Sequence, residues 1–466
     1  MTENKSDAMC STVCAPNEYF TKKLSTGKYL VTTRHRQYAF LDAKEYDLLY
    51  REQFQENKEL FEKLEKTGII FTEKNIKKIV GSFEKQYIFL FFPKSFRINL
   101  SNECNLMCSY CLSNATPTQH ETMSDELVDA TIKFMLSAPG KKFYMEFQGG
   151  EPLVKFNEIK KFVAKIKLAA EVGKKEIEKI VIVTNMTLMT EEIAEYLLEN
   201  NIGLCSSLDG PEELHDIHRK FGGGGGTYKT VTKWLSYFRE RGKTINTLPT
   251  ITAHSIKFGA RKIIDEYLKQ GCIRIPIRAV IPVGRAKQND NHTYSAEEFI
   301  AFWKDAVEYL VEITLNGNPV FDPNTQAMLR NIMDGPVSYM CMRKPCGGAI
   351  SHMSISCDGT IMPCDLSKTL PEMAIGNVRE SHIDVALRTI NMNARTSDFQ
   401  PLCNTCAFGP YCGNCYTRTR AVFSDETPRT PRDFECKVNK AMFTYLFEKM
   451  QDAKYVKVFR IWINGR

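Results

Sequence analysis

Three cysteines stand close together in the run Cys104-Asn-Leu-Met-Cys108-Ser-Tyr-Cys111. Thiolates are the ligands of zinc sites and of iron–sulfur clusters. Three thiolates neither close a tetrahedral site on one metal nor ligate every iron of a four-iron cluster, so one position stays open for a small molecule. The spacing therefore indicates a reactive iron–sulfur cluster. A zinc loop or three unrelated core cysteines are the alternatives.

Polar and glycine residues follow the next three strands that the sequence predicts. These residues are Gly149, Gly150, Glu151 and Pro152 after the second strand, Thr184 and Asn185 after the third, and Ser207 and Asp209 after the fourth. Glycines let a backbone approach a ligand closely, and a carboxylate such as that of Glu151 suits an ammonium group. Each motif is weak alone, because strand ends are often capped by such residues.

The C-terminal part of the chain holds a second concentration of cysteines. Nine of the 16 cysteines lie between Cys341 and Cys436, in a segment with little continuous apolar pattern. Such a segment is expected to fold around metals. Spacing alone does not separate zinc from iron. The candidate ligands are Cys341, Cys346, Cys364, Cys403, Cys406, Cys412, Cys415 and Cys436.

The composition excludes several classes of protein. Apolar content of 43% and charged content of 25% over 466 residues are those of a globular protein of two to four domains. The net charge of +7 comes without a Lys/Arg block, so nucleic-acid binding is not indicated. The first residues lack the apolar core of a secretory signal, and no apolar run could span a membrane. We therefore expect a cytoplasmic protein, whose cysteines suit metal sites better than disulfides.

Residues 1–95 are predicted to form an N-terminal domain. Short strands are expected at Lys28–Thr33 and Tyr38–Leu41, and helices at Ala43–Glu52, Glu56–Lys66 and Glu73–Val80. A hairpin followed by small helices is a winged-helix-like arrangement. A structural extension with no binding role is the alternative.

Strands and helices alternate over residues 96–325. Strands are expected at Arg97–Leu100, Lys142–Phe147, Lys179–Thr184, Gly203–Leu208, Asn246–Ala253 and Ile273–Ile281. Helices are expected at Ser124–Ser137, Asn157–Glu171, Thr190–Asn200, Thr227–Arg241 and Ala260–Gln270. Repeated β/α units imply an α/β fold with a parallel sheet and ligands at the carboxyl ends of its strands.

The alternation of strands and helices stops after residue 325. Residues 326–440 are predicted to form a cysteine-rich domain, and residues 441–466 a C-terminal helix and tail. The helix is expected at Asn439–Gln451 and a candidate strand at Tyr455–Ile463.

In combination these motifs resemble those of the radical S-adenosylmethionine (SAM) superfamily. The cysteine run, with Tyr110 before its last cysteine, is similar to the superfamily signature, and Gly149–Pro152 is similar to its GGEP motif. The resemblance implies a partial (β/α)6 TIM-like barrel, and the six predicted strands fit that count. It implies a SAM-binding 4Fe–4S cluster on Cys104, Cys108 and Cys111. The SAM contacts that it implies are Tyr110, Gly149, Gly150, Glu151, Pro152, Thr184, Asn185, Ser207 and Asp209.

The C-terminal cysteines resemble the SPASM domain, which carries two auxiliary 4Fe–4S clusters. The resemblance implies that Cys341, Cys346, Cys364 and Cys415 hold one cluster and that Cys403, Cys406, Cys412 and Cys436 hold the other. The family usually has three residues between the positions of Cys412 and Cys415, where this chain has two. Two zinc sites are the alternative.

Several residues outside these sets also bear on function. Asp365 resembles the position of a proton-accepting aspartate in anaerobic sulfatase maturases, although it could equally accept backbone N–H bonds at a turn. His215, His218 and Arg219 are expected to be solvated helix residues rather than catalysts.

Five cysteines belong to no predicted cluster. They are Cys10, Cys14, Cys205, Cys272 and Cys357. Cys205 and Cys272 are expected to be small core residues. A thiol near the radical site that donates a hydrogen atom, as in peptide epimerases, is the alternative.

The resemblance implies the chemistry as well. A reduced cluster passes one electron to SAM, and the resulting 5′-deoxyadenosyl radical abstracts a hydrogen atom from the substrate. The N-terminal block resembles peptide-recognition domains that bind a leader peptide as an added strand. We therefore expect a maturase of a ribosomally synthesised peptide that forms a thioether or carbon–carbon cross-link. Its partners would be a precursor peptide and an electron donor such as flavodoxin or ferredoxin.

Two alternatives to this function remain open. One is formylglycine formation of the sulfatase-maturase type. The other is a non-catalytic, metal-bound scaffold that binds peptides.

Overall fold

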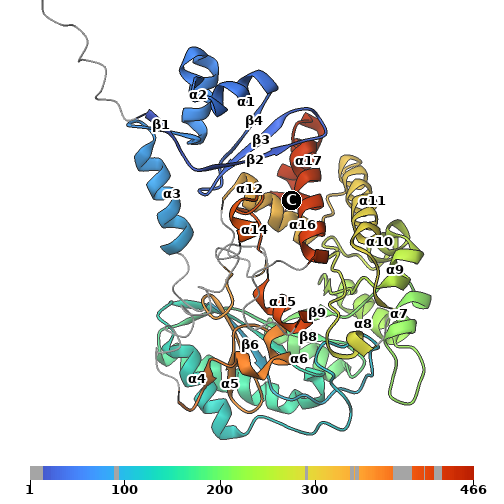
Figure 1. Cartoon of the computed structure of the whole chain (residues 1–466). Helices are drawn as coiled ribbons and strands as arrows, with labels where there is room; N and C mark the ends of the chain where they lie inside the picture. The colour runs from blue at the N-terminus through green and yellow to red at the C-terminus, as the bar shows by residue number, and fades with distance from the viewer. Residues whose placement is uncertain are drawn as a thin grey trace, which may run out of the picture.

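The fold is taken from a computed structural model of the chain. It describes residues 14–88, 94–288, 292–335, 341, 346–380, 401–413, 415–423 and 433–465. Cys10 lies outside the described residues, and so does the part of the predicted cysteine-rich domain between residues 381 and 400. Figure 1 shows an N-terminal domain above a group of C-terminal helices, with the main sheet and its helices below them.

The N-terminal domain is built on a three-stranded antiparallel sheet in the order β2-β3-β4. Its elements are β2 (Tyr19–Lys23), β3 (Tyr29–Thr33), β4 (Tyr38–Leu41), α1 (Ala43–Tyr50), α2 (Lys58–Thr67) and α3 (Ile76–Ile88), with β1 (Cys14–Pro16) paired to β5 (Ile70–Thr72). Asp42 begins α1 with a capping box, and the Asn57 side chain caps α2. The predicted hairpin and its three helices are confirmed. β2 was not predicted.

The main sheet has the order β10-β9-β8-β7-β6-β11-β12-β13. Its strands are β6 (Ser95–Asn99), β7 (Lys142–Gln148), β8 (Glu176–Thr184), β9 (Gly203–Ser206), β10 (Asn246–Thr247), β11 (His352–Ile355), β12 (Thr360–Met362) and β13 (Gly376–Asn377). The strands from β10 to β6 are all parallel, and β11 continues the parallel sheet beside β6. A strand from the cysteine-rich region thus extends the sheet at its first strand.

Helices connect the parallel strands as the repeated β/α units predict. They are α4 (Asp125–Ser137), α5 (Phe156–Val172), α6 (Glu191–Glu199), α7 (Glu212–His218), α8 (Tyr228–Glu240), α9 (Ala253–Phe258) and α10 (Ala260–Lys269). Ser124 and Thr190 cap α4 and α6 through their hydroxyls. The core between sheet and helices is apolar, and Met145 and Phe147 of β7 are completely buried in it.

Two predicted strands are wrong, and the strand predicted at Asn246–Ala253 is reduced to β10 (Asn246–Thr247), with Ala253 starting α9. No strand forms over Ile273–Ile281, where isolated bridges join Arg274 to Phe321 and Ala279 to Ile251. Residues Tyr455–Ile463 belong to a helix, α17 (Ala453–Asn464). The buried residues of α17 recur at helical spacing, which a short apolar run does not distinguish from a strand.

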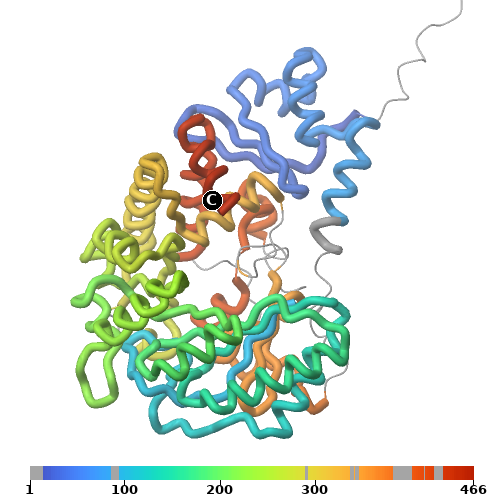
Figure 2. Tube along the Cα trace, turned by 180° about the vertical axis from the view of Figure 1, so that it is seen from behind, coloured from blue at the N-terminus to red at the C-terminus, as the bar shows by residue number. Residues whose placement is uncertain are grey.

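The C-terminal helices support both the sheet and the N-terminal domain. They are α11 (Ala296–Leu315), α12 (Pro323–Met333), α14 (Pro401–Asn404), α15 (Tyr416–Phe423), α16 (Asp433–Lys449) and α17. The N-terminal domain lies on α12, α16 and α17 in both views (Figures 1 and 2). The Ser25 hydroxyl donates to Glu448 of α16 at 2.6 Å, so the N-terminal domain contacts a C-terminal helix directly. No helix among the described residues is long and apolar enough to cross a membrane.

Candidate active site

A pocket of about 290 Å³ opens at the carboxyl ends of the parallel strands. It brings together most of the residues that the sequence predicted for the SAM site. Those lining it are Cys104, Cys108, Tyr110, Cys111, Gly150, Glu151, Thr184, Asn185 and Ser207. The apolar residues Val183, Leu248, Val280 and Ile281 complete its wall. Polar groups from four successive strand ends therefore converge on one cavity, as β/α folds require.

The three thiols lie in a loop that the rest of the barrel holds in place. Arg285 donates to the carbonyl oxygens of Cys108 at 2.8 Å and of Ala115 at 2.9 Å. The pKa of the Cys104 thiol is raised to about 12, chiefly by burial, and the nearby Cys108 and Cys111 contribute to this shift. Metal binding deprotonates such thiols. Three clustered thiols beside an open cavity fit a cluster with one open iron.

The glycines after β7 allow the backbone to pass very close to the segment that precedes the cysteine loop. A Cβ on Gly149 would lie 2.0 Å from the Asn99 side-chain oxygen, and a Cβ on Gly150 would lie 2.0 Å from the Glu103 carbonyl oxygen. The backbone of Glu151 donates to the same carbonyl at 2.8 Å. The close approach is thus to the cysteine loop, whereas the sequence suggested an approach to the ligand.

Glu151 is buried and accepts three hydrogen bonds. The donors are the Thr184 hydroxyl at 2.6 Å, the Asn185 backbone N–H at 2.7 Å and the Leu153 backbone N–H at 3.0 Å. Burial raises the pKa of Glu151 to about 7, although these donors oppose the shift. Glu151 thus joins the ends of β7 and β8. A direct contact with the SAM amine stays a prediction.

A buried ion pair at the wall of the pocket was missed by the sequence reasoning. Asp209 is fully buried and pairs with Arg219 at 2.9 Å. Tyr110 donates its hydroxyl proton to Asp209, and Arg219 also contacts the Cys108 sulfur at 3.9 Å. Burial opposes the ionisation of Asp209, but Arg219 outweighs it and lowers the pKa of the carboxyl. Asp209 and Arg219 therefore position the cysteine loop.

The histidines near this ion pair are buried, so the expectation of solvated helix residues is wrong. The exposed fractions are 0% for His215, 1% for His218 and 8% for Arg219. A signal for this burial was present in the sequence, because one short helix separates the carboxylate of Asp209 from the cation of Arg219. We expected Asp209 to face the ligand, so the pairing was not recognised.

Four C-terminal cysteines surround one small cavity. They are Cys403, Cys406, Cys412 and Cys436, the set predicted for one auxiliary cluster. Asn439 donates to the Cys412 sulfur at 3.4 Å. Four thiols around one cavity fit a closed four-iron cluster.

The other predicted set is also gathered in space. Burial raises the pKa of the Cys415 thiol, and Cys346 and Cys364 lie near enough to contribute. Burial also raises the pKa of the Cys364 thiol, and Cys341 lies near enough to contribute to that shift. Despite its irregular spacing, Cys415 thus lies with the cysteines predicted to share its cluster.

Asp365 lies outside the SAM pocket, in an ion-pair network between the cysteine-rich region and the sheet. Its carboxylate contacts Arg97 of β6 at 2.8 Å and Lys368 at 3.4 Å, and accepts a hydrogen bond from Ser354 at 3.1 Å. Its side chain makes no helix-cap hydrogen bond, so the turn-capping alternative is wrong. Burial opposes ionisation, but Arg97 and Lys368 lower the pKa of Asp365 to about 2. Its role as a general base stays a prediction.

The remaining cysteines differ in burial. Cys272 and Cys357 are buried, whereas Cys14 and Cys205 are half-buried. Burial raises the pKa of the Cys205 thiol to about 12. Among the described residues, none of these four lines the SAM pocket. A core role agrees with Cys272.

Comparison with known families identifies both regions. Residues 98–257 match the model of the radical SAM superfamily, and residues 346–416 match that of the SPASM iron–sulfur cluster-binding domain. The cysteine-type anaerobic sulfatase-maturating enzyme of Clostridium perfringens is 25% identical over 367 residues, which cover 75% of this chain and 95% of that enzyme.

Two solved structures share the fold. The structure of native anSMEcpe with bound AdoMet matches with a TM-score of 0.69 and 23% identity, over 78% of this chain and 100% of that one. Streptococcus suis SuiB bound to S-adenosylmethionine matches with a TM-score of 0.53 and 17% identity, over 90% of this chain and 98% of that one.

The fold, the site and the two domain matches define a class: the chain carries a radical SAM domain followed by a SPASM iron–sulfur cluster-binding domain. Its cofactors are SAM and 4Fe–4S clusters. Because the chain is an enzyme of this class, the alternative of a non-catalytic scaffold is set aside.

Proposed function

We propose that this enzyme oxidatively cross-links a ribosomally synthesised peptide, through a thioether or a carbon–carbon bond. The observation that carries the proposal is the N-terminal domain, whose outer strand has a free edge. Among the described residues β2 pairs only with β3. A free strand edge can accept an extended peptide through main-chain hydrogen bonds.

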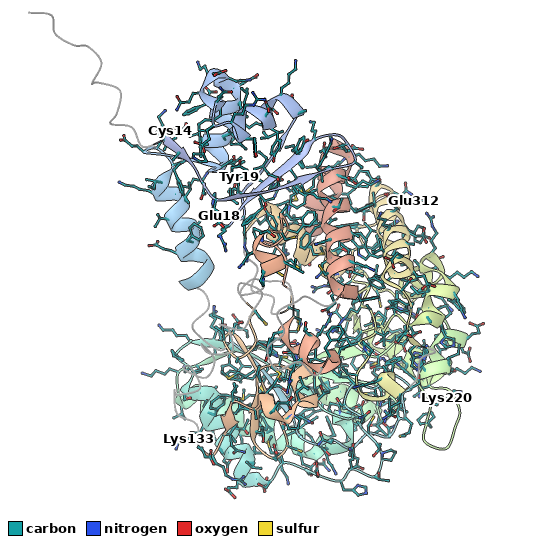
Figure 3. The ribbon with its side chains drawn as sticks, viewed as in Figure 1. Cys14, Glu18, Tyr19, Lys133, Lys220 and Glu312 are labelled. Carbon is teal, nitrogen blue, oxygen red and sulfur yellow. The ribbon has the colours of Figure 1, made fainter. Side chains whose placement is uncertain are left out.

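The N–H groups that point outward from β2 follow from the register of the hairpin. Leu24 donates its N–H to the Lys28 carbonyl at 2.9 Å, and hydrogen-bonded pairs alternate with non-bonded pairs along an antiparallel ladder. The pairing of Thr21 with Val31 is three residues from that bond and is therefore non-bonded. The Thr21 N–H thus faces away from β3. Glu18 and Tyr19, at the start of this strand, are labelled in Figure 3.

The domain that carries this edge is fixed to the catalytic part of the chain. Thr32 of β3 donates its hydroxyl proton to the Ala407 carbonyl at 2.7 Å, and Arg36 donates to the Asn331 side chain at 2.8 Å. Both contacts are buried. A peptide bound along β2 would therefore start from a defined position relative to the cluster-bearing domains.

The length of the relatives supports the same proposal. The anSMEcpe structure is matched in full by 78% of this chain, so about a fifth of this chain has no counterpart there. SuiB, which matches 90% of this chain, has been solved bound to its precursor peptide SuiA. The radical SAM match begins only at residue 98, after the N-terminal domain.

We propose the ligand sets as the sequence predicted them. Cys104, Cys108 and Cys111 would hold the SAM-binding cluster, and the two sets of four C-terminal cysteines would hold the auxiliary clusters. When bound, SAM and the reduced cluster supply the hydrogen-abstracting chemistry. The chain's own residues hold the cysteine loop through Arg219 and Arg285. A flavodoxin or ferredoxin would supply the electron.

Formylglycine formation is the second candidate. This candidate is supported by the similarity to the cysteine-type anaerobic sulfatase-maturating enzyme, because the alignment with this chain covers 95% of that enzyme. The environment of Asp365 favours it less, because a carboxylate paired with Arg97 and Lys368 and with a pKa of about 2 is a weak base at neutral pH.

The experiment uses the reduced full-length enzyme, SAM and a synthetic precursor peptide encoded beside the gene, with products read by mass spectrometry. A cross-link removes a pair of hydrogen atoms from the peptide, whereas formylglycine formation replaces a cysteine thiol by an aldehyde. Formation of 5′-deoxyadenosine without any change in the peptide would refute that peptide as the substrate.

A matched pair of variants tests the strand edge. Thr21→Pro removes the outward N–H, which an edge strand tolerates, whereas Thr21→Ala keeps it. Both lose the Thr21 hydroxyl contact with Tyr46. We expect at least roughly tenfold weaker peptide binding in Thr21→Pro alone, because the main-chain ladder supplies much of the affinity. Equal binding by the two variants would show that the peptide does not bind along β2.

A further inference from the structure

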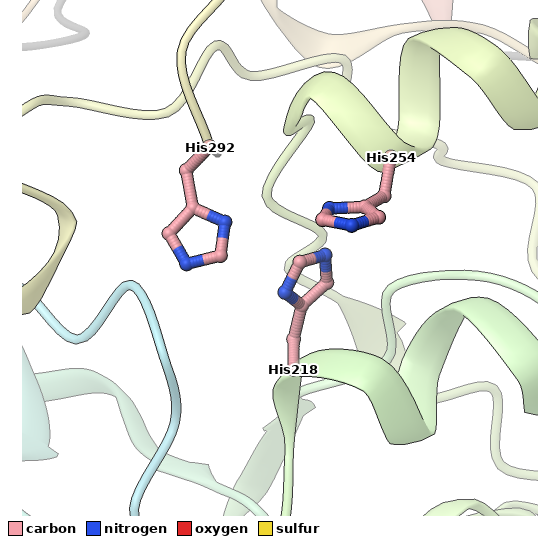
Figure 4. Close-up of side chains that lie close together, drawn as sticks. All are labelled: His218, His254 and His292. Atoms are coloured by element: carbon pink, nitrogen blue, oxygen red, sulfur yellow. The ribbon is translucent and has the colours of Figure 1, made fainter. Parts of the chain in front are cut away.

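Three imidazoles meet beside the SAM pocket and have no part in the function proposed above (Figure 4). They come from three separate segments. His218 ends α7, His254 lies at the start of α9, and His292 precedes α11. One ring nitrogen of each lies within 4.8 Å of the others. Among the described residues, no other group of three or more His, Cys, Asp or Glu side chains brings its ligand atoms this close together.

The group is buried, yet several of its nitrogens have no hydrogen-bond partner. His218 is 1% exposed and His292 is 2% exposed. Both ring nitrogens of His292 and the Nδ1 of His254 are buried without a hydrogen bond of good geometry, although the Ser109 backbone lies near the His292 ring. A buried polar group left without a partner has lost its hydration without a compensating hydrogen bond. Three such atoms in one place indicate that a common ligand satisfies them.

Ring packing alone does not account for these nitrogens. The ring centroid of His218 lies 5.1 Å from that of His254 and 5.1 Å from that of His292. The angle between the ring planes is 75° in the first pair and 65° in the second. Such edge-to-face contacts explain why the rings are close. They satisfy neither the donor nor the acceptor of a neutral imidazole.

The surroundings favour neutral imidazoles, the form that binds metal ions. Burial lowers the pKa of His218 to about 4, and burial and the nearby His254 lower that of His292. Asp209 opposes the shift of His218, but its carboxylate already pairs with Arg219. Three neutral nitrogen donors without a thiolate or carboxylate suit zinc and its neighbours among the divalent transition metals.

We propose that His218, His254 and His292 together bind one divalent transition-metal ion of the zinc class, with a water molecule in the fourth position. Zinc–nitrogen bonds of about 2.0–2.1 Å in a tetrahedron place the nitrogens roughly 3.3 Å apart. Because 4.8 Å is the largest separation in the group, each side chain needs to move inward by at most about 1 Å when the ion binds, which rotation about its own torsions supplies.

The site has supporting hydroxyl groups and a direct connection to the cysteine loop. The two ring nitrogens of His218 lie 3.0 Å from the Ser109 hydroxyl and 2.9 Å from the Thr252 hydroxyl. One of these contacts is replaced by the ion, and the other remains to orient the ring, as outer partners of metal-bound histidines do. Thr252 also caps α9, which carries His254. The ion would thus join α7 and α9 to the loop that contains Tyr110.

The test measures metal binding and is independent of the peptide substrate. The full-length enzyme with its iron–sulfur clusters reconstituted is mixed with one equivalent of ZnCl2 and desalted, and its zinc and iron contents are measured. The variants are His254→Ala and His292→Ala, and the control is His120→Ala, which removes an exposed imidazole outside the group. Zinc X-ray absorption reports the donor atoms.

We expect about one zinc per chain in the wild type and in His120→Ala, coordinated by nitrogen and oxygen only. His254→Ala and His292→Ala should bind zinc more than roughly tenfold more weakly while keeping their iron. If His292→Ala loses iron, the fold is disturbed, and His254→Ala, whose side chain is half-buried, decides the question. No retained zinc, sulfur-coordinated zinc, or undiminished binding by His254→Ala would overturn the proposal and leave a water-filled group of histidines.

Discussion

Two aspartate–arginine pairs, one buried and one half-buried, serve different purposes in this molecule. Asp209 and Arg219, 2.9 Å apart, lie at the wall of the SAM pocket, which Arg219 lines, whereas Asp365 and Arg97 lie between the cysteine-rich region and the sheet, 2.8 Å apart. The first pair contacts the cysteine loop through Tyr110. The second joins two regions that are far apart in the sequence.

The pairs also differ in how much support each carboxylate has. Among the described residues Arg219 is the sole salt-bridge partner of Asp209, which is completely buried. Asp365 has Lys368 as a second cation, and Arg97 has Glu146 as a second carboxylate, 3.0 Å away. The pair beside the reactive site thus has a single cation, supported by hydrogen bonds from Tyr110 and the Thr250 N–H, whereas the pair that joins two regions shares its charges within a network of four groups.

The largest effect is expected from Arg219→Met. Asp209 would remain buried without a cation, which typically costs about 3–5 kcal/mol of folding free energy. Chemical denaturation of the reconstituted enzyme measures the loss, and the control is Arg241→Met, which removes an exposed pair with Glu195. A loss no greater than that of the control would contradict the claim that this ion pair holds the cysteine loop.

A smaller effect is expected from Asp365→Asn. Arg97 keeps Glu146 as its partner, so the loss should be roughly 1–3 kcal/mol. Because the pKa of Asp365 is lowered to about 2, its stabilising charge is lost only as the pH falls from about 4 toward 2. The difference in stability between wild type and variant should therefore be constant from pH 5 to pH 8. A difference that changes within that range would indicate a carboxyl that titrates near neutrality, as a general base does.

The smallest effect is expected from Lys368→Met. Its ammonium group lies 3.4 Å from Asp365, which keeps Arg97 when Lys368 is removed. The loss should be about 1 kcal/mol or less, measured by the same denaturation. A loss equal to that of Arg219→Met would remove the distinction between the single pair and the network.

The sequence predicted the parts of the fold that have a strong repeating pattern. The alternating segments from β6 to β9, their helices and the N-terminal hairpin all form, because their apolar periodicity matches their burial. The strand expected at Tyr455–Ile463 is a helix. An apolar run of nine residues fits the periodicity of a helix as well as that of a strand, and the sequence does not show which elements pack against it. The sixth predicted strand, Ile273–Ile281, is irregular backbone with isolated bridges. Tertiary contacts, which the sequence pattern does not show, determine whether such a segment joins the sheet.

The candidate site was predictable where several motifs occur in register. The cysteine loop, Glu151 and Thr184 were placed together, because the ends of parallel strands meet. Asp209 was predicted to face the ligand, but its carboxylate is occupied by Arg219. The histidine group joins α7, α9 and the segment before α11, so no local spacing could have revealed it.

The measurement that tests the central claim most directly is the iron and labile sulfide content after anaerobic reconstitution. It compares the wild type with a variant carrying Cys104→Ala, Cys108→Ala and Cys111→Ala. One open cluster and two closed clusters predict about twelve irons per chain in the wild type and about eight in the variant, which should form no 5′-deoxyadenosine. Unchanged iron in the variant, or little iron with stoichiometric zinc in the wild type, would contradict the account.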